Sequence, residues 1–198
     1  MRNIDSYTHT RGESVYLDDI PEIAGTLNAA VYGSPEAHGI IKQLHLDDAL
    51  AVKGVVKILT NKDIPGKNQI GGIVKDEPLL ADGVVHFNGM PVAIVVAENA
   101  DAAHEAVKKI KIDIEPLPVV TLARVAQQNG ALIVPPRTFK IGDSQSAFAQ
   151  CKYIFEGIAE TNGQEHLYIE TQGAYAIPVE NGAIKIYSST QGPTAVQK

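Results

Sequence analysis

Residues 84–116, VVHFNGMPVAIVVAENADAAHEAVKKIKIDIEP, contain the pattern that decides the fold. A strand is expected from Val84 to Phe87, followed by an Asn-Gly turn. The unbroken apolar run at 91–97 then predicts a central strand covered on both faces. Asn99 is a typical N-cap residue, and apolar residues recur after it at helical spacing as far as Ile110. Alternating isoleucines then predict a further strand. This part of the chain therefore combines strand, helix and strand.

The residues before this unit predict a strand, a strand, a short helix and a strand over 25–59. The three strands are expected at 27–31, 41–46 and 55–59. Asp47 is expected to cap the helix, which should end near Gly54. A polar, glycine-rich stretch from Asn61 to Asp76 predicts a long surface loop.

Two prolines in the stretch Glu115-Pro116-Leu117-Pro118 predict the end of the first domain, because proline can neither donate to a strand ladder nor continue a helix. A short helix at 122–128, closed by Gly130, and a Pro-Pro loop form the expected connector. The expected division of the chain is a domain over 1–118, a connector over 119–140 and a further domain over 141–198.

The remainder is predicted to be rich in strands, at 152–161, 166–171, 173–179 and 183–189. Asn181 and Gly182 lie between the last two runs and favour a hairpin, since both residue types tolerate positive φ. Pro193 suits the first turn of a helix. The chain ends soon afterwards, so we expect it to be cut short within this domain.

Composition indicates a soluble globular protein, with 44% hydrophobic and 20% charged residues. The longest apolar run, 91–97, is far shorter than the roughly 20 residues of a membrane-crossing helix. The start lacks the profile of a secretory signal, so a cytoplasmic location is expected. The net charge is −6 and the one basic stretch, 108–111, is short, which argues against a nucleic-acid partner.

Side chains with catalytic potential are sparse. No two of the six histidines have a metal-ligand spacing such as His-Glu-x-x-His, so no metal ligand is predicted. The single cysteine, Cys151, cannot supply the thiolates of an iron–sulfur cluster. It follows a short predicted helix with no histidine nearby, so we expect a core thiol rather than a nucleophile. The glycines form neither a dinucleotide-binding nor a phosphate-binding loop, and no catalytic residue is predicted.

One polar cluster, Asn162-Gly163-Gln164-Glu165-His166, lies between two predicted strands. Its side chains suit a loop that caps neighbouring backbone groups, and they also suit a functional site on a loop. The residue types by themselves leave both interpretations open.

Several further segments occur in a fixed order: VYLDDIP at 15–21, SPEAH at 34–38, KDIPG at 62–66, EPLLADGVV at 77–85, GMPVAIVVAE at 89–98, IEPLPVV at 114–120, GD at 142–143, GQEHLYIET at 163–171 and SSTQ at 188–191. This succession resembles the molybdenum hydroxylases, the family of xanthine dehydrogenase and aldehyde oxidase, over nearly the whole chain. The resemblance implies an α+β fold, in which an α/β-hammerhead domain is followed by the first β-rich segment of the molybdenum-cofactor-binding domain.

The resemblance also implies a function for the complete protein. Such enzymes oxidise a purine, an aldehyde or an N-heterocycle with water as the oxygen source, using a molybdenum–molybdopterin cofactor. Iron–sulfur clusters and FAD lie on other domains or subunits, which are implied partners together with the rest of the molybdenum-binding subunit. The family's glutamate base and its substrate-contacting segments have no counterpart here, so the chain alone is expected to be inactive and its substrate stays open.

One functional residue is carried over from the family motif, the Gln of the GQEH segment, which is Gln164 here. The resemblance implies that its amide lies beside the metal and hydrogen-bonds an oxo ligand. An N–H group aimed at such an oxygen stabilises the charge that gathers there when the metal is reduced.

The alternative is a non-catalytic carrier or assembly module of hammerhead type. Hammerhead folds resemble domains that carry biotin or lipoate on a lysine, and Lys62 is followed by an aspartate. The residues around Lys62 lack the symmetric hairpin that presents such a lysine, which disfavours this interpretation.

Overall fold

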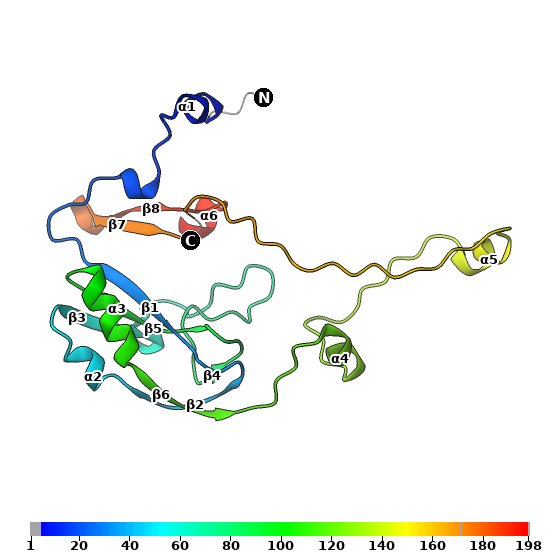
Figure 1. The fold of residues 1–198 in the computed structure, drawn as a ribbon, viewed down its shortest axis with the longest axis horizontal. Helices are drawn as coiled ribbons and strands as arrows, with labels where there is room; N and C mark the ends of the chain where they lie inside the picture. The colour runs from blue at the N-terminus through cyan, green and yellow to red at the C-terminus, as the bar shows by residue number, and fades with distance from the viewer. Residues whose placement is uncertain (1–4, 171, 198) are drawn as a thin grey trace. The chain divides into compact units, whose positions relative to one another are not determined.

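The computed structural model describes residues 5–170 and 172–197 of the chain (Figure 1). Its internal contacts define two compact units. Ile23–Arg137 form the first, which we call the central unit, and Met1–Glu22 with Thr138–Lys198 form the second, the terminal unit. Along the described residues, no helix has both the length and the apolar character needed to cross a membrane.

The central unit contains the elements that the sequence predicts around its strand–helix–strand unit. In chain order they are β1 (Asn28–Gly33), β2 (Gly39–His45), α2 (Asp47–Leu50), β3 (Val55–Thr60), the 3₁₀ turn η2 (Asn61–Asp63), β4 (Val84–Val85), β5 (Pro91–Ala97), α3 (Ala100–Lys109), β6 (Lys111–Pro116) and α4 (Ala123–Gln128). The loop expected over 61–76 begins with η2, and no other helix or strand follows before β4. The predicted connector helix is confirmed as α4, and Gly130 follows it at a φ of 69°.

Strand β5 is the central strand of its sheet, as predicted. The sheet has the order β1-β5-β3, and both neighbours pair with β5 in antiparallel fashion. Val95 lies opposite Ala30 on one side and opposite Ile58 on the other. A second sheet has the order β4-β2-β6. Hydrogen bonds on both edges leave β5 no free edge.

Both faces of β5 contribute to buried clusters, which confirms the prediction that this strand is covered on both faces. Ala93, Val95 and Ala97 belong to the cluster that includes residues of α3, whereas Val92 belongs to another cluster together with Val85. Successive side chains of a strand point to opposite faces, so alternate positions reach different clusters. An unbroken apolar run is therefore required at β5.

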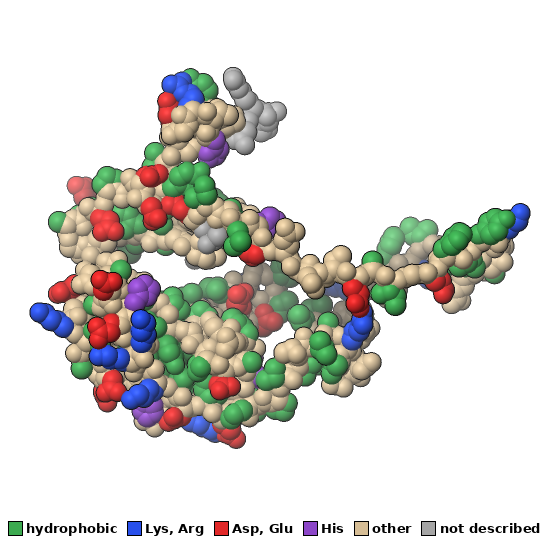
Figure 2. All heavy atoms as spheres, in the orientation of Figure 1, with side chains coloured by type: hydrophobic (Ala, Val, Ile, Leu, Met, Phe, Trp, Pro, Cys, Tyr) green, Lys and Arg blue, Asp and Glu red, His purple; other side chains and the backbone are tan. Residues whose placement is uncertain are grey.

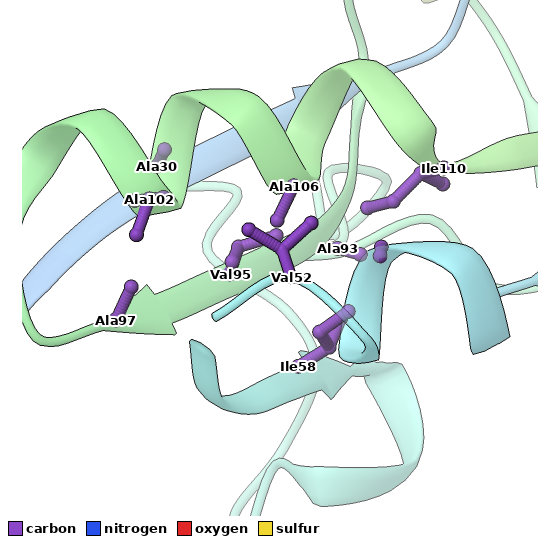
Figure 3. Close-up of a cluster of buried hydrophobic side chains, with 11 residues drawn as sticks. Ala30, Val52, Ile58, Ala93, Val95, Ala97, Ala102, Ala106 and Ile110 are labelled. Atoms are coloured by element: carbon purple, nitrogen blue, oxygen red, sulfur yellow. The ribbon is translucent and has the colours of Figure 1, made fainter. Parts of the chain in front are cut away.

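Helix α3 covers the first sheet through small side chains (Figure 3). Asn99 caps it as predicted, since its Oδ1 accepts the N–H of Ala102 at 2.9 Å. The helix contributes three buried alanines, Ala102, Ala103 and Ala106, and Ile110 closes the cluster at its end. Small side chains on a helix allow its backbone to approach the sheet closely, and they leave little room for a larger residue.

The second sheet carries polar contacts between exposed side chains. Lys42 forms an ion pair with Glu115, and Nε2 of His45 lies 2.9 Å from Oδ2 of Asp113. Figure 2 shows charged side chains of both signs gathered along the part of the surface that overlies β2 and β6. Exposed pairs contribute little to stability, and their presence indicates that this face is solvated.

Two local predictions in the central unit are wrong. Asp47 is the first helical residue of α2 rather than its cap; Leu46 occupies the cap position without a side-chain hydrogen bond, and the helix ends at Leu50. The strand expected from Val84 to Phe87 has only two residues, because Phe87 already begins the turn: its carbonyl accepts the N–H of Met90 at 3.1 Å.

The terminal unit contains a hairpin and several short helices. In chain order its elements are α1 (Ser6–Arg11), the 3₁₀ turn η1 (Leu17–Asp19), α5 (Ser144–Ala149), β7 (Ala174–Pro178), the turn η3 (Glu180–Gly182), β8 (Ile184–Ser188) and α6 (Pro193–Gln197). The predicted hairpin is confirmed, because β7 and β8 pair and Asn181 and Gly182 have φ values of 60° and 73°. The helix predicted to begin at Pro193 is confirmed as well.

The other two strands predicted for this region are not formed. Residues 152–161 and 166–170 belong to no ladder, and Thr171, the last residue of the second predicted strand, lies outside the described residues. Alternating apolar residues suit a strand, but a strand also requires a neighbour that pairs with its N–H and C=O groups. Phe155 and Ile158 are accordingly 92% and 89% exposed. Exposed hydrophobic side chains also gather around α5 (Figure 2).

Enlarging a buried alanine of α3 should destabilise the central unit. We expect Ala106→Leu to lower the free energy of unfolding by about 1–3 kcal/mol, because the added atoms cannot fit between the helix and the sheet. Ala106 is 0% exposed, whereas Ala100 on the same helix is exposed. Ala100→Leu is the matched control and should change stability by less than about 0.5 kcal/mol. Equal urea-unfolding midpoints for the two variants would contradict this packing.

The division into 1–118, 119–140 and 141–198 stays a prediction, which limited trypsin digestion checks. First cleavage is expected after Arg124, Arg137 or Lys140, or after Lys152 in the stretch that forms no ladder. Backbone held in ladders must open before a protease can bind it, so β5 to β6 should persist in the surviving fragment. Mass spectrometry identifies the cut sites, and a first cut within 84–115 would count against the division.

Candidate functional site

Gln164, the one site residue predicted, lies on an exposed stretch of the terminal unit that has no regular structure. No hydrogen bond to its side chain occurs among the described residues. The adjacent Glu165 caps the local backbone instead, since its Oε1 accepts the N–H of His166 at 2.9 Å. Within this polar cluster, Glu165 thus makes a local backbone contact, whereas the role predicted for Gln164 stays a prediction.

The segment that carries Gln164 is anchored at its far end by Glu170. The Glu170 carboxylate accepts the N–H groups of Leu17 and Asp18, each at 2.8 Å. Sequence analysis missed this contact, because its partners are more than 150 positions apart and no local pattern joins them. Both partners do lie in segments quoted for the family resemblance, 15–21 and 163–171.

The GD segment at 142–143 has a structural role. Asp143 caps α5: its Oδ1 accepts the N–H groups of Gln145 and Ser146 at 3.1 and 3.2 Å. Its Oδ2 accepts the hydroxyl of Ser146 at 2.6 Å. The hydrogen bonds from the hydroxyl and the N–H of Ser146 lower the pKa of the Asp143 carboxyl, because they stabilise its charged form.

Histidines of the central unit make contacts within the fold. The rings of His38 and His86 stack with their centroids 6.0 Å apart, and Nδ1 of His38 lies 2.7 Å from the carbonyl oxygen of Pro118. Within the described ranges, no group of three or more His, Cys, Asp or Glu side chains could hold a metal ion. Two surface hollows of the terminal unit, one beside His9 and one beside Ile186, do not include Gln164 in their lining.

The prediction that Cys151 is a core thiol is wrong. Cys151 is exposed, and its Sγ lies 3.4 Å from the carbonyl oxygen of Ala147. The reason is the absence of a core around it: every buried residue in the described part of the chain lies between Ala30 and Ile110. Helix α5, which precedes Cys151, therefore has no buried surface against which a thiol could pack.

The segment around Lys62 forms a structural turn rather than a hairpin that presents a lysine. Lys62 lies in η2, where Oδ2 of Asp63 accepts the N–H of Thr60 at 2.9 Å. This backbone hydrogen bond is the main cause of the lowered pKa of Asp63, and Lys57 contributes as well. The geometry required by a carrier module is thus not present at Lys62.

Comparison with protein families gives two matches that follow one another along the chain. Residues 11–118 match the family model for the aldehyde oxidase and xanthine dehydrogenase a/b hammerhead domain. Residues 125–198 match the model for the molybdopterin cofactor-binding domain. These matches confirm the predicted fold class, an α/β-hammerhead domain followed by the start of a molybdenum-cofactor-binding domain.

Similar curated proteins are much longer than this chain. A xanthine dehydrogenase of Emericella nidulans is 34% identical over 198 residues, which are 98% of this chain and 14% of that protein. Aldehyde oxidase 2 of Rattus norvegicus is 37% identical over 200 residues, 100% of this chain and 15% of that protein. The chain therefore spans about one seventh of the length of these relatives.

A solved structure gives the same result for the fold. The aldehyde oxidoreductase from Desulfovibrio gigas superposes with a TM-score of 0.79 and 29% sequence identity, over 93% of this chain and 23% of that one. The hammerhead match alone covers more than half of the sequence. The chain belongs to the aldehyde oxidase and xanthine dehydrogenase family.

Proposed function

We propose that this chain forms the hammerhead domain and the opening segment of the cofactor-binding domain of a molybdenum hydroxylase. The complete enzyme would oxidise a purine, an aldehyde or an N-heterocycle with water as the oxygen source. One observation carries this proposal: the amide of Gln164 is exposed and unpaired among the described residues, within the segment that matches the molybdopterin cofactor-binding domain.

Gln164 fits a contact with such a cofactor. Its amide N–H needs no rearrangement of protein hydrogen bonds before it can donate to an oxygen atom of the cofactor. A molybdenum–pterin group, when bound, provides a centre that accepts two electrons from the substrate. A neutral donor fixed beside that centre stabilises negative charge on the oxygen while adding no charge of its own.

The remaining parts of the site must come from partners. The length of the relatives supports the rest of the molybdenum-binding subunit as the first partner. Domains or subunits with iron–sulfur clusters and FAD are further proposed partners, and a small molecule is the proposed substrate. The chain alone is expected to be inactive, because it contributes a single amide where a preorganised site needs several contacts. The cytoplasmic location predicted above is part of this proposal and rests on the sequence alone.

Replacing Gln164 by Ala in the complete enzyme should slow turnover without disturbing the fold. Loss of one donor aimed at developing charge costs about 10²–10³ in rate, or about 2.7–4 kcal/mol. Folding and molybdenum content should stay near normal, because an exposed side chain without a hydrogen bond to the described residues adds little to stability. Steady-state kinetics and elemental analysis provide the two measurements.

Gln172→Ala is the matched control, since Gln172 is also exposed and follows the same segment. It should turn over at the wild-type rate. If Gln164→Ala also kept wild-type turnover at full molybdenum loading, the proposed role of Gln164 would be refuted.

A further inference from the structure

Glu170 joins two distant parts of the chain through a pair of backbone hydrogen bonds. Its Oε2 accepts the N–H of Leu17 and its Oε1 accepts the N–H of Asp18, each at 2.8 Å. All three residues belong to the terminal unit. Leu17 and Asp18 open the 3₁₀ turn η1, and the first N–H groups of a helical turn have no partner inside it. The carboxylate therefore acts as a cap from outside the turn.

A second contact lies beside the first. The side chain of Leu17 packs over the backbone of Gly173: a Cβ atom placed there would lie only 2.6 Å from Cδ2 of Leu17. Gly173 is held in turn, since its carbonyl oxygen accepts the N–H of Ser189 at 3.0 Å. The η1 turn thus contacts both Glu170 and the base of the β7–β8 hairpin. Two independent contacts connect the same segments.

The backbone of Glu170 supports a specific role for its side chain. Its φ is 53°, in the left-handed region that residues other than glycine, asparagine and aspartate seldom adopt. Two further carboxylates, Asp18 and Asp19, lie in the η1 turn that it contacts. Neither the backbone conformation nor the local charge favours a glutamate here, so the two hydrogen bonds account for its placement.

We propose that Glu170 is a positioning residue, which fastens the end of the Gln164-bearing segment to the η1 turn. Glu170 comes six positions after Gln164, and a chain of that length spans at most about 22 Å. Fixing Glu170 therefore limits the space that the Gln164 amide can sample. The effect on the cofactor rests on the proposed function, whereas the fastening itself does not.

Glu170→Gln in the full chain tests the fastening. A carboxylate offers an acceptor oxygen to each N–H, whereas an amide offers only one acceptor and turns an NH₂ group toward the other N–H. By NMR, at least one of the Leu17 and Asp18 amide protons should shift and exchange with solvent about tenfold faster or more. The Val95 amide in β5 should keep its protection, which shows that the central unit of the variant is folded.

Glu165→Gln is the matched control, because Glu165 lies in the same segment and bonds only its neighbour's N–H. It should leave the Leu17 and Asp18 amides as in the wild type. If Glu170→Gln also left both amides unchanged, or if Glu165→Gln altered them to the same extent, the fastening by Glu170 would be overturned.

Kinetics of the complete enzyme test the positioning. Glu170→Gln should lower kcat with KM unchanged, and it should cause no further loss when Gln164 is already Ala, because it acts through that side chain. Losses that multiply in the double variant would overturn the positioning role. Wild-type turnover of the Gln164→Ala variant would instead refute the proposed function, and the amide exchange of Leu17 and Asp18 would still decide the fastening.

Discussion

Strand β5 is the constraint on which the central unit depends. It is hydrogen-bonded along both edges, and its alternate side chains enter two separate buried clusters. Val95 and Val92 are each 3% exposed or less, and burial of such side chains typically contributes about 1.5–3 kcal/mol. A strand fixed on four sides sets the register of β1 and β3 and the distance at which α3 packs. A polar or large substitution there would disturb the cluster that its side chain enters.

The terminal unit is organised in a different way. Its described residues bury no side chain, and its contacts include the β7–β8 hairpin, the caps of short helices, the hydrogen bonds that Glu170 accepts from the η1 turn and the packing of Leu17 on Gly173. Polar contacts can hold backbone in place without a core, although each adds only a modest amount to stability. Gln164 lies in this unit, and its side-chain amide has no hydrogen bond to the other described residues.

The features that sequence could predict are those with local causes. Asn99 caps α3 through its own amide, and Asn181 adopts positive φ within a two-strand hairpin, so a few neighbouring residues suffice to predict both. The sequence could not reveal that residues 152–161 form no strand. Alternating apolar residues indicate that a segment is compatible with a strand, but not that a pairing partner is present. Glu170 was missed because its donors are remote in sequence. Gln164 was singled out by the family motif, since nothing in its chemistry distinguishes it from other loop glutamines.

The central unit has a buried core, whereas none of the described residues of the terminal unit is buried and hydrogen bonds hold its segments. Hydrogen exchange of the full chain, resolved by residue, tests this contrast most directly. Amides of β5 that bond to β1 and β3 should exchange only through global unfolding, whereas amides over 152–161 should exchange at nearly the rate of unstructured peptide. Equal protection in the two segments would contradict the account, because it would require a ladder or a buried core in a stretch where the structure has neither.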